Sequence, residues 1–145
     1  MIKLNYMSKA YWEHFEHKAD IGVRGFGNTL EKSFEQAAIA MTAVITDVSR
    51  VQTTATISIS CSDDDNETLL YDWLNALIYE MATRKMLFSK FTVTIDECKL
   101  TAIVAGEAID IERHQPSVEI KGATYTELAV YQQGQQWVAQ CVIDV

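Results

Sequence analysis

The segment from Asn28 to Ile45 is the feature that most constrains the fold. Apolar residues recur there at the three- and four-residue spacing of a helix with one buried face: Leu30, Phe34, Ala37, Ala38, Met41, Val44 and Ile45. Asn28 is expected to cap this helix, because its side chain can accept an early backbone N–H and Glu31 can reach back to it. The segment therefore predicts an amphipathic helix that packs on other elements.

A second helix is expected after the acidic run Asp63–Asp65. Its apolar stripe consists of Leu69, Leu70, Trp73, Leu74, Leu77, Ile78 and Met81. Three adjacent carboxylates are favourable at a helix N-terminus, where the backbone dipole is positive. A cation site is the alternative interpretation of this run.

Most of the remaining chain has the two-residue alternation of β-strands. Strands are expected over Tyr11–His17, Ile21–Phe26, Val51–Cys61, Phe91–Ile95, Leu100–Ile111, Thr124–Tyr131 and Gln136–Val145, with a hairpin turn at QQGQ between the last two. The order of helices and strands predicts an α+β fold. We expect one two-layer domain, a mostly antiparallel or mixed sheet with two amphipathic helices packed on it.

Length and composition favour one ordinary globular domain. The chain has 145 residues, of which 48% are hydrophobic and 22% charged. We expect a poorly ordered segment over residues 1–10 and a single domain over residues 11–145. No apolar run approaches the roughly 20 residues of a membrane helix, and the N-terminus lacks the pattern of a signal peptide. No membrane association is therefore expected.

Charge and cysteine content point to a cytoplasmic protein that does not bind nucleic acid directly. The net charge is −8 and the few cations do not cluster, so phosphate backbones would be repelled. Cys61, Cys98 and Cys141 are odd in number and widely spaced, which is typical of reduced cysteines. A basic protein partner or a bound cation suits this charge better.

The glycines and histidines between Glu13 and Gly27 do not form a recognisable cofactor motif. Gly22, Gly25 and Gly27 follow G-x-x-G-x-G, the reverse of the dinucleotide fingerprint, so they are expected to allow positive φ or close backbone approach. His14 and His17 are three residues apart, which places them on opposite faces of a strand. They are therefore not expected to share a metal, although His17 can orient a nearby carboxylate.

Three aspartates in apolar settings are the candidate metal ligands. Asp20 precedes the glycine segment, Asp47 follows the first helix, and Asp144 precedes the terminal Val145. Two neighbouring anions, such as the Asp144 side chain and the carboxylate of Val145, are costly unless a cation or a proton relieves them. The residues predict either a shared site for Ca²⁺, Mg²⁺ or Mn²⁺, or three aspartates that cap or pair separately.

From Trp12 to the last residue, the chain resembles the archease family. The resemblance rests on H-x-A-D-I-G-x-x-G-x-G in HKADIGVRGFG, on I-K-x-x-T-Y in IKGATY, and on an aspartate just before the C-terminal residue. These motifs occur in the family's order. Thr126 departs from the family, many members of which have histidine at this position.

The resemblance implies an accessory role and no catalysis by the protein itself. Archeases assist the RtcB-type RNA ligase, which joins tRNA exon halves and other RNAs ending in a 2′,3′-cyclic phosphate or 3′-phosphate. They promote its guanylylation from GTP and its multiple turnover, and they bind a divalent cation, for which Ca²⁺ is the first expectation and Mg²⁺ or Mn²⁺ the alternatives. The family's metal-binding aspartates match Asp20 and Asp144, with the carboxylate of Val145, and Asp47 is a weaker match. Lys121 matches a functional lysine of the I-K-x-x-T-Y motif.

A different class of function is also compatible with the same aspartates. In a small metal-dependent hydrolase, they would hold a catalytic metal and water for attack on a phosphorylated substrate. The sequence offers no evident general base or phosphate cradle for this reaction. The accessory role that the resemblance implies has no small-molecule substrate of its own. A cation-stabilised binding module with another partner is the third possibility.

Overall fold

The computed structural model describes residues 9–145, and the first strand begins at Tyr11. The elements in chain order are β1 (Tyr11–His17), β2 (Asp20–Gly27), α2 (Leu30–Ile45), the 3₁₀ turn η1 (Val48–Arg50), β3 (Ala55–Ser62), α3 (Asn66–Arg84), β4 (Met86–Asp96), β5 (Lys99–Ala108), α4 (Ile111–His114), β6 (Gly122–Ala123), β7 (Ala129–Gln133) and β8 (Gln136–Asp144). Most of the N-terminal segment expected to be poorly ordered lies outside the described residues. Over residues 9–145, no helix is long and apolar enough to cross a membrane.

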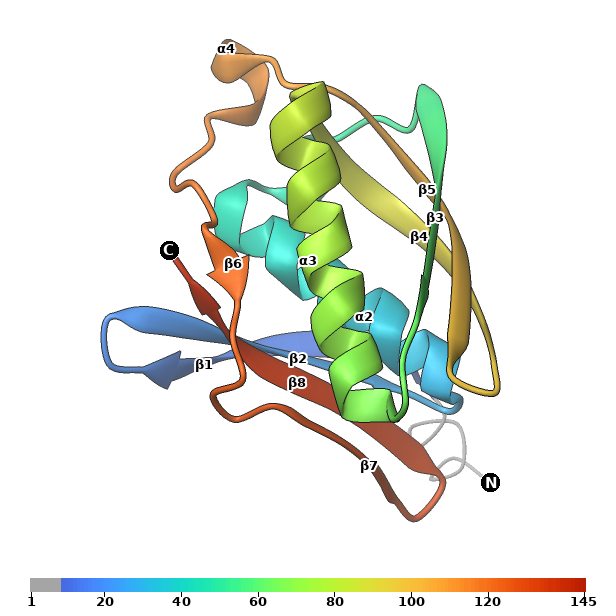
Figure 1. Cartoon of the computed structure of the whole chain (residues 1–145). Coiled ribbons are helices and arrows are strands. Elements are labelled where there is room, and N and C mark those ends of the chain that lie inside the picture. The colour runs from blue at the N-terminus through green and yellow to red at the C-terminus, as the bar shows by residue number, and fades with distance from the viewer. Residues whose placement is uncertain (1–8) are drawn as a thin grey trace.

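The strands form two antiparallel sheets with the long helices between them (Figure 1). One sheet has the order β1-β2-β8-β6, with β7 also paired to β8, and the other has the order β3-β5-β4. The α+β class is confirmed, but the strands do not join in one sheet as expected. Alternation shows which side chains of a strand face the core, and it does not show which strands pair.

Helix α2 is buried around much of its circumference because it packs between the two sheets. Phe34, Ala38 and Met41 are almost fully buried, and the helix contacts β2, β8 and β4. Helix α3 packs across both sheets, and its Trp73 indole donates a hydrogen bond of 3.1 Å to the carbonyl of Phe34. This bond links the two helices inside the core.

The residue that caps the N-terminus differs from the prediction for α2, and the acidic start predicted for α3 is confirmed. Thr29, and not Asn28, caps α2 by accepting the backbone N–H of Lys32 at 3.1 Å. The expected cap was wrong by one residue. Asp65 caps α3 by accepting the N–H of Thr68 at 2.8 Å, so the acidic run does lie at a helix start.

The glycines of β2 allow neighbouring groups to approach its backbone closely. A Cβ atom on Gly25 would collide with the backbone of Ser33 and Ala37 in α2, and a Cβ atom on Gly22 would collide with the ring of Phe15. None of these glycines has positive φ; among the glycines of residues 9–145, only Gly134 does. Of the two roles expected for the glycines, close approach is the one observed.

The C-terminal third contains the expected hairpin and an unexpected helical turn. Strands β7 and β8 pair around Gly134, which confirms the turn at QQGQ. The strand expected over Thr124–Tyr131 starts five residues late, since β7 begins at Ala129, and the separate short strand β6 ends at Ala123, before the expected range. The strand expected to reach Ile111 ends at Ala108, and Asp110 caps the short helix α4 instead.

Candidate metal centre

The HKADIGVRGFG motif and the C-terminal residues meet at one edge of the five-stranded sheet. The backbone N–H of Val145 donates to Oδ1 of Asp20 over 3.4 Å. The β2–β8 register pairs Ile21 with Ile143, and one further step sets Asp20 opposite Asp144. Because directly opposite residues share a face of the sheet, both aspartates lie on the same side. Figure 1 shows the C-terminus on the side of the molecule where the β1–β2 hairpin turns.

Lys121 is joined to this region through its backbone. Its N–H donates to the carbonyl of Asp144 at 2.8 Å, and the next residue, Gly122, pairs with Asp144 in the β6–β8 ladder. The Lys121 side chain is exposed. The structure therefore places the Lys121 backbone next to that of Asp144, with the Lys121 side chain open to solvent.

His17 faces Asp20 across the β1–β2 turn. The two residues are register partners, and Lys18 between them has a positive φ of 54°. Within residues 9–145, the half-buried His17 side chain makes no hydrogen bond, so the expected bond to a carboxylate is not formed in this arrangement. His14 instead lies 2.7 Å from the carbonyl of Ala40 through Nε2. The two histidines have separate surroundings, as their odd spacing predicted.

Asp47 has partners of its own. Its Oδ1 accepts hydrogen bonds from the N–H of Ser49 at 3.0 Å and from the Ser49 hydroxyl at 2.7 Å, and Arg50 lies 3.9 Å from Oδ2. The Ser49 hydrogen bonds, followed by the charge of Arg50, lower the pKa of Asp47. Asp47 thus serves as the cap of η1.

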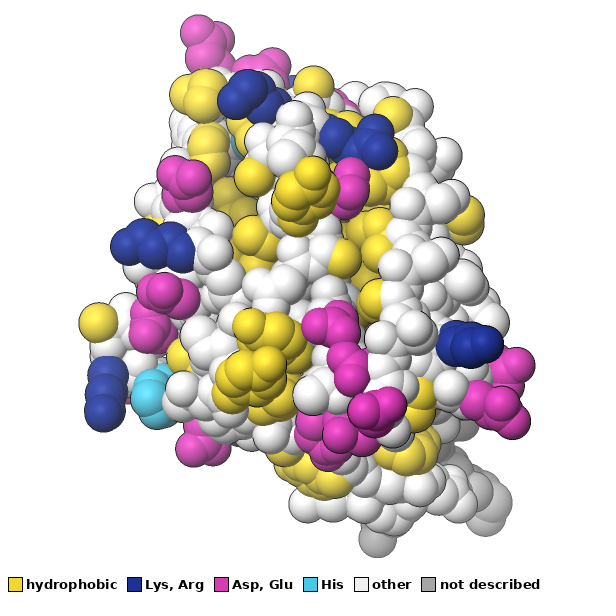
Figure 2. All heavy atoms as spheres, in the orientation of Figure 1, with side chains coloured by type: hydrophobic (Ala, Val, Ile, Leu, Met, Phe, Trp, Pro, Cys, Tyr) yellow, Lys and Arg dark blue, Asp and Glu magenta, His cyan; other side chains and the backbone are white. Residues whose placement is uncertain are grey.

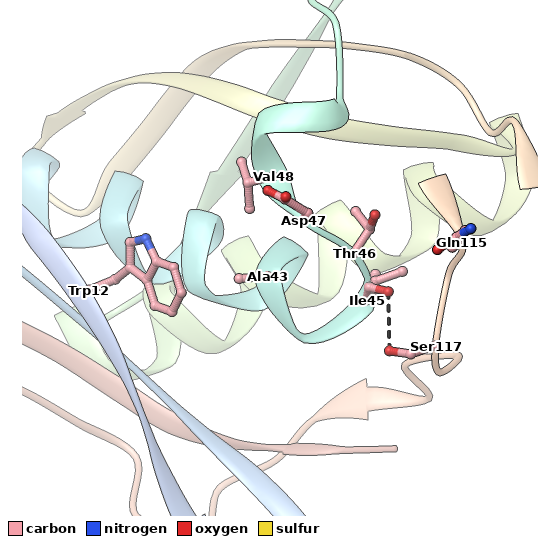
Figure 3. Close-up of a pocket in the computed structure, with 8 residues that line it drawn as sticks. All are labelled: Trp12, Ala43, Ile45, Thr46, Asp47, Val48, Gln115 and Ser117. Atoms are coloured by element: carbon pink, nitrogen blue, oxygen red, sulfur yellow. Dashed lines mark hydrogen bonds between the residues drawn. The ribbon is translucent and has the colours of Figure 1, made fainter. Parts of the chain in front are cut away.

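Asp47 also borders a shallow hollow of about 440 Å³ (Figure 3). The hollow is lined by Trp12, Ala43, Ile45, Thr46, Asp47, Val48, Gln115 and Ser117. Figure 3 shows the Trp12 indole at one end and Gln115 with Ser117 at the other. Its wall is formed by the last turn of α2 and the residues that follow it to Val48, by the segment after α4, and by Trp12 of β1.

The three predicted aspartates therefore do not form one cluster of side chains. Among residues 9–145, no group of three or more His, Cys, Asp or Glu side chains is placed to hold a metal ion. The geometry instead joins Asp20 with Asp144 and Val145.

The acidic surface at the start of α3 also includes Asp72, which lies close to the Asp63–Asp65 run and which the sequence pattern did not identify. Burial, the hydrogen bond with Asp63 and the charge of Asp63 raise the pKa of Asp72 to about 6. The pKa of Asp63 is lowered, chiefly by the hydrogen bond with Asp72. The rings of Tyr71 and Tyr125 stack beside them with centroids 4.3 Å apart. Figure 2 shows acidic side chains gathered near hydrophobic ones at this end of the molecule.

A buried ionic network holds α4 to β5. The carboxylate of Glu107 accepts from the N–H of Gln52 at 2.7 Å, from Arg113 at 2.6 and 2.8 Å, and from His114 at 3.0 Å. Arg113, the Gln52 amide and His114 together hold the pKa of Glu107 well below its usual range. His114 Nδ1 accepts the N–H of Asp110, so Nε2 carries the proton donated to Glu107. The polar sequence after Ala108 gave no periodic signal for this network.

Comparison with known proteins agrees with the motifs gathered at this edge. The model of the Archease protein family (MTH1598/TM1083) matches residues 12–145. The chain is 37% identical over 139 residues to Protein archease of Pyrococcus furiosus and 38% identical over 136 residues to Protein archease of Sulfurisphaera tokodaii. Each alignment covers 92% of this chain and 98% of the relative.

Solved structures show the same fold. The solution structure of Methanobacterium thermoautotrophicum protein 1598 matches with a TM-score of 0.82 and 36% identity, over 92% of this chain and 98% of that one. The crystal structure of an archease from Thermotoga maritima, described as a possible chaperone, matches with a TM-score of 0.62 and 18% identity, over 92% and 96%. The protein belongs to the archease family.

Proposed function

We propose that this protein is an accessory activator of an RtcB-type RNA ligase in tRNA splicing and RNA repair. In this role it promotes guanylylation of the ligase from GTP and repeated turnover, and it performs no catalysis of its own. The observation that carries the proposal is the contact between Asp20 and Val145. It brings together the two motifs on which an archease-type metal centre would depend.

Asp20, Asp144 and the carboxylate of Val145 would hold the divalent cation. Three neighbouring anions repel one another, and a cation at this edge would relieve that repulsion. Carboxylate oxygens are the ligands that Ca²⁺, Mg²⁺ and Mn²⁺ share, so the donor set fits any of the three. Asp47 is the weakest of the proposed ligands, because Ser49 and Arg50 already engage its carboxylate.

Lys121 and His17 would act at the margin of this centre. The Lys121 ammonium is exposed, and its backbone is bonded to Asp144, so it can meet a phosphate or a partner carboxylate. His17 is the register partner of Asp20 in the hairpin, and we propose that it turns to hydrogen-bond that carboxylate only when the cation is bound. Both residues would assist the cation and the partner without taking part in a reaction.

The charge of the chain favours a protein surface over RNA as the direct partner. With a net charge of −8, the protein would be repelled by a phosphate backbone and attracted by a basic protein surface. The acidic edge can therefore dock near a ligase site that itself binds GTP and RNA. This arrangement would reorganise that site for guanylylation.

Ligation turnover tests the proposal. The ligase is assayed with a 2′,3′-cyclic phosphate RNA in the absence or presence of the wild-type protein, Asp20→Ala or Asp144→Ala. Asp64→Ala is the matched control, because Asp64 is an exposed aspartate at the other end of the fold whose carboxylate caps nothing. We expect stimulation by the wild type and the control, and loss of stimulation with Asp20→Ala and Asp144→Ala.

Equal stimulation by all four proteins would show that the metal centre is not needed. Turnover of phosphate esters or RNA by the isolated protein with Mn²⁺ would instead support a hydrolase. The accessory role predicts that no such turnover occurs.

A further inference from the structure

Strand β3 (Ala55–Ser62) is an edge strand of the three-stranded sheet and contains no charged residue. No residue from Val51 to Ser62 is charged, although the chain as a whole carries −8. By contrast, β1, the edge of the other sheet, contains Glu13 and Glu16. Natural proteins commonly protect the free edges of sheets with charges, bulges or covering side chains, because unpaired backbone groups attract other strands.

Helix side chains cover three other strand edges. Four side chains of α2 and α3 accept hydrogen bonds from backbone N–H groups of β4, β7 and β6: Glu35 from Val93 at 2.9 Å, Glu31 from Ile95 at 3.4 Å, Glu67 from Val130 at 3.2 Å and Asn75 from Ala123 at 3.0 Å. These carboxylates and the amide replace a neighbouring strand. An additional strand cannot pair at the covered positions without displacing them.

Strand β3 has no such cover in the part of the chain that the structure describes. No side chain there bonds to the backbone of Ala55–Ser62, whose ladder with β5 runs from Ala55 to Ser62 without a bulge. The opposite edge strand, β4, is interrupted by a register shift between Phe88 and Lys90. The β3 edge is thus regular, uncharged and available along its length.

The two faces of β3 are suited to continuation of the sheet. Ile59 is buried, but Ile57 and Cys61 on the same inner face are only half-buried. Thr56, Ser58 and Ser60 are exposed on the outer face. Figure 2 shows an almost uncharged surface over β3, at the right of the view, with hydrophobic atoms visible between it and α3. A strand paired there would need apolar residues on one face and small polar residues on the other.

We propose that β3 pairs with β3 of a second copy of this chain, which joins the two three-stranded sheets across a twofold axis. Strand β3 itself has apolar residues on one face and small polar residues on the other, which is the pattern that a strand paired with it needs. A twofold axis perpendicular to the sheet pairs the two strands antiparallel and leaves the inner faces of both copies on the same side of the joined sheet. Antiparallel pairing also sets the acidic run Asp63–Asp65 of one copy beside the uncharged start of β3 in the other. The proposal is independent of the metal centre and of the ligase.

This surface is small, so the dimer depends on protein concentration. A single pair of strands buries less surface than a standard stable interface. Population of the dimer is therefore expected to rise across roughly 10 µM to 1 mM protein and to depend on the β3 surface alone.

The test compares two lysine substitutions on one row of the outer face. Ser58, Ile103 and Thr92 are register partners across β3, β5 and β4, so Ser58→Lys and Thr92→Lys place the same charge on opposite edges of one sheet. Both positions are exposed. In the proposed dimer, the two charges introduced by Ser58→Lys would lie near the twofold axis and repel each other. The two charges introduced by Thr92→Lys would lie far from that axis.

Sedimentation equilibrium of the full chain measures the dimer dissociation constant of the wild type and of both variants. We expect a wild-type dimer whose dissociation constant rises about fivefold or more with Ser58→Lys and does not change with Thr92→Lys. Circular dichroism confirms that both variants are folded, and Ser60→Lys replaces Ser58→Lys if that variant is not. A wild-type protein that stays monomeric at about 1 mM, or a dimer equally sensitive to both substitutions, would overturn the proposal.

Discussion

The carboxylate of Asp20 accepts the backbone N–H of Val145 at 3.4 Å, across 125 positions of the sequence. This contact exists because β2 and β8 pair along their whole length, which brings the first hairpin to the end of the chain. It gives the terminal residues a defined place on the sheet edge. The proposed function rests on this neighbourhood of Asp20 and the last residues of β8.

The affinity for a divalent metal should depend on Asp20 and Asp144 but not on Asp47. We expect Asp20→Asn and Asp144→Asn each to weaken Mn²⁺ or Ca²⁺ binding roughly tenfold or more, because each removes a charged ligand. Asp47→Asn should leave the affinity nearly unchanged, since Ser49 already occupies that carboxylate. Isothermal titration calorimetry provides the affinities. If Asp47→Asn weakened metal binding as much as the other two substitutions, η1 would have to move so that Asp47 joins Asp20 and Asp144 at the metal.

Gly25 should be the most sensitive glycine of β2. A Cβ atom there would meet the backbone of Ser33 and Ala37, which cannot move without separating α2 from the sheet. We expect Gly25→Ala to lower the free energy of unfolding by about 3 kcal/mol or more and Gly22→Ala by about 1–2 kcal/mol. The second loss is smaller because the Phe15 ring can turn aside. Urea unfolding measures both, and an equal loss would show that the helix–sheet contact is soft.

The stability of the protein should respond to pH through Asp72. Its pKa of about 6 lies above the ordinary value of 3.8, so the folded state holds a proton that the unfolded state releases. Stability from this group is present below pH 3.8 and is lost as pH rises through 6. Asp72→Asn should therefore raise Tm at about pH 7.5 and change it little at about pH 3.5.

Asp64→Asn is the control for this pH effect, because it removes the same charge from an exposed neighbour of the pair. Differential scanning calorimetry at the two pH values gives the comparison. If Asp64→Asn reproduced the gain at the higher pH, the cause would be general charge reduction and not the Asp63–Asp72 contact.

Glu107 should give the protein stability that is lost in acid, which is the opposite pH dependence to that of Asp72. Arg113, the Gln52 amide and His114 depress its pKa below the ordinary 4.5, so its contribution is present above pH 4.5 and is lost as pH falls through the folded-state value. Glu107→Gln should lower the free energy of unfolding at neutral pH, because Arg113 loses its partner. It should also flatten the decline of stability in acid below pH 4.5. Urea unfolding across this range would contradict the account if the acid slope were unchanged.

The sequence predicted the helices and strands in which burial recurs at a regular spacing. It did not predict the features that depend on contacts between residues far apart in the chain. The stripe from Leu30 to Ile45 and the alternation in β3 and β8 identified those elements, since burial of one face repeats along the chain. The division into two sheets was missed because strand pairing leaves no periodic mark. Helix α4 was missed because its four residues are stabilised by Glu107 and the Asp110 cap, which local periodicity does not register.

The candidate site was likewise predicted in part from local sequence and in part only from the tertiary structure. Apolar surroundings singled out Asp20 and Asp144, and the β2–β8 register brings them together. Asp47 had a similar local pattern, yet its partner is Ser49, two residues away. Local sequence indicated an aspartate that needs a partner, and only the tertiary structure distinguishes a cap from a shared site.

Formation of the ligase–GMP adduct tests the central claim most directly. An RtcB-type ligase is incubated with labelled GTP and the wild-type protein, Asp144→Asn or Asp64→Asn, and the guanylylated fraction is measured before any RNA is added. The account predicts that the wild type and Asp64→Asn raise this fraction and that folded Asp144→Asn does not. Equal stimulation by Asp144→Asn, or no stimulation by the wild type, would contradict it.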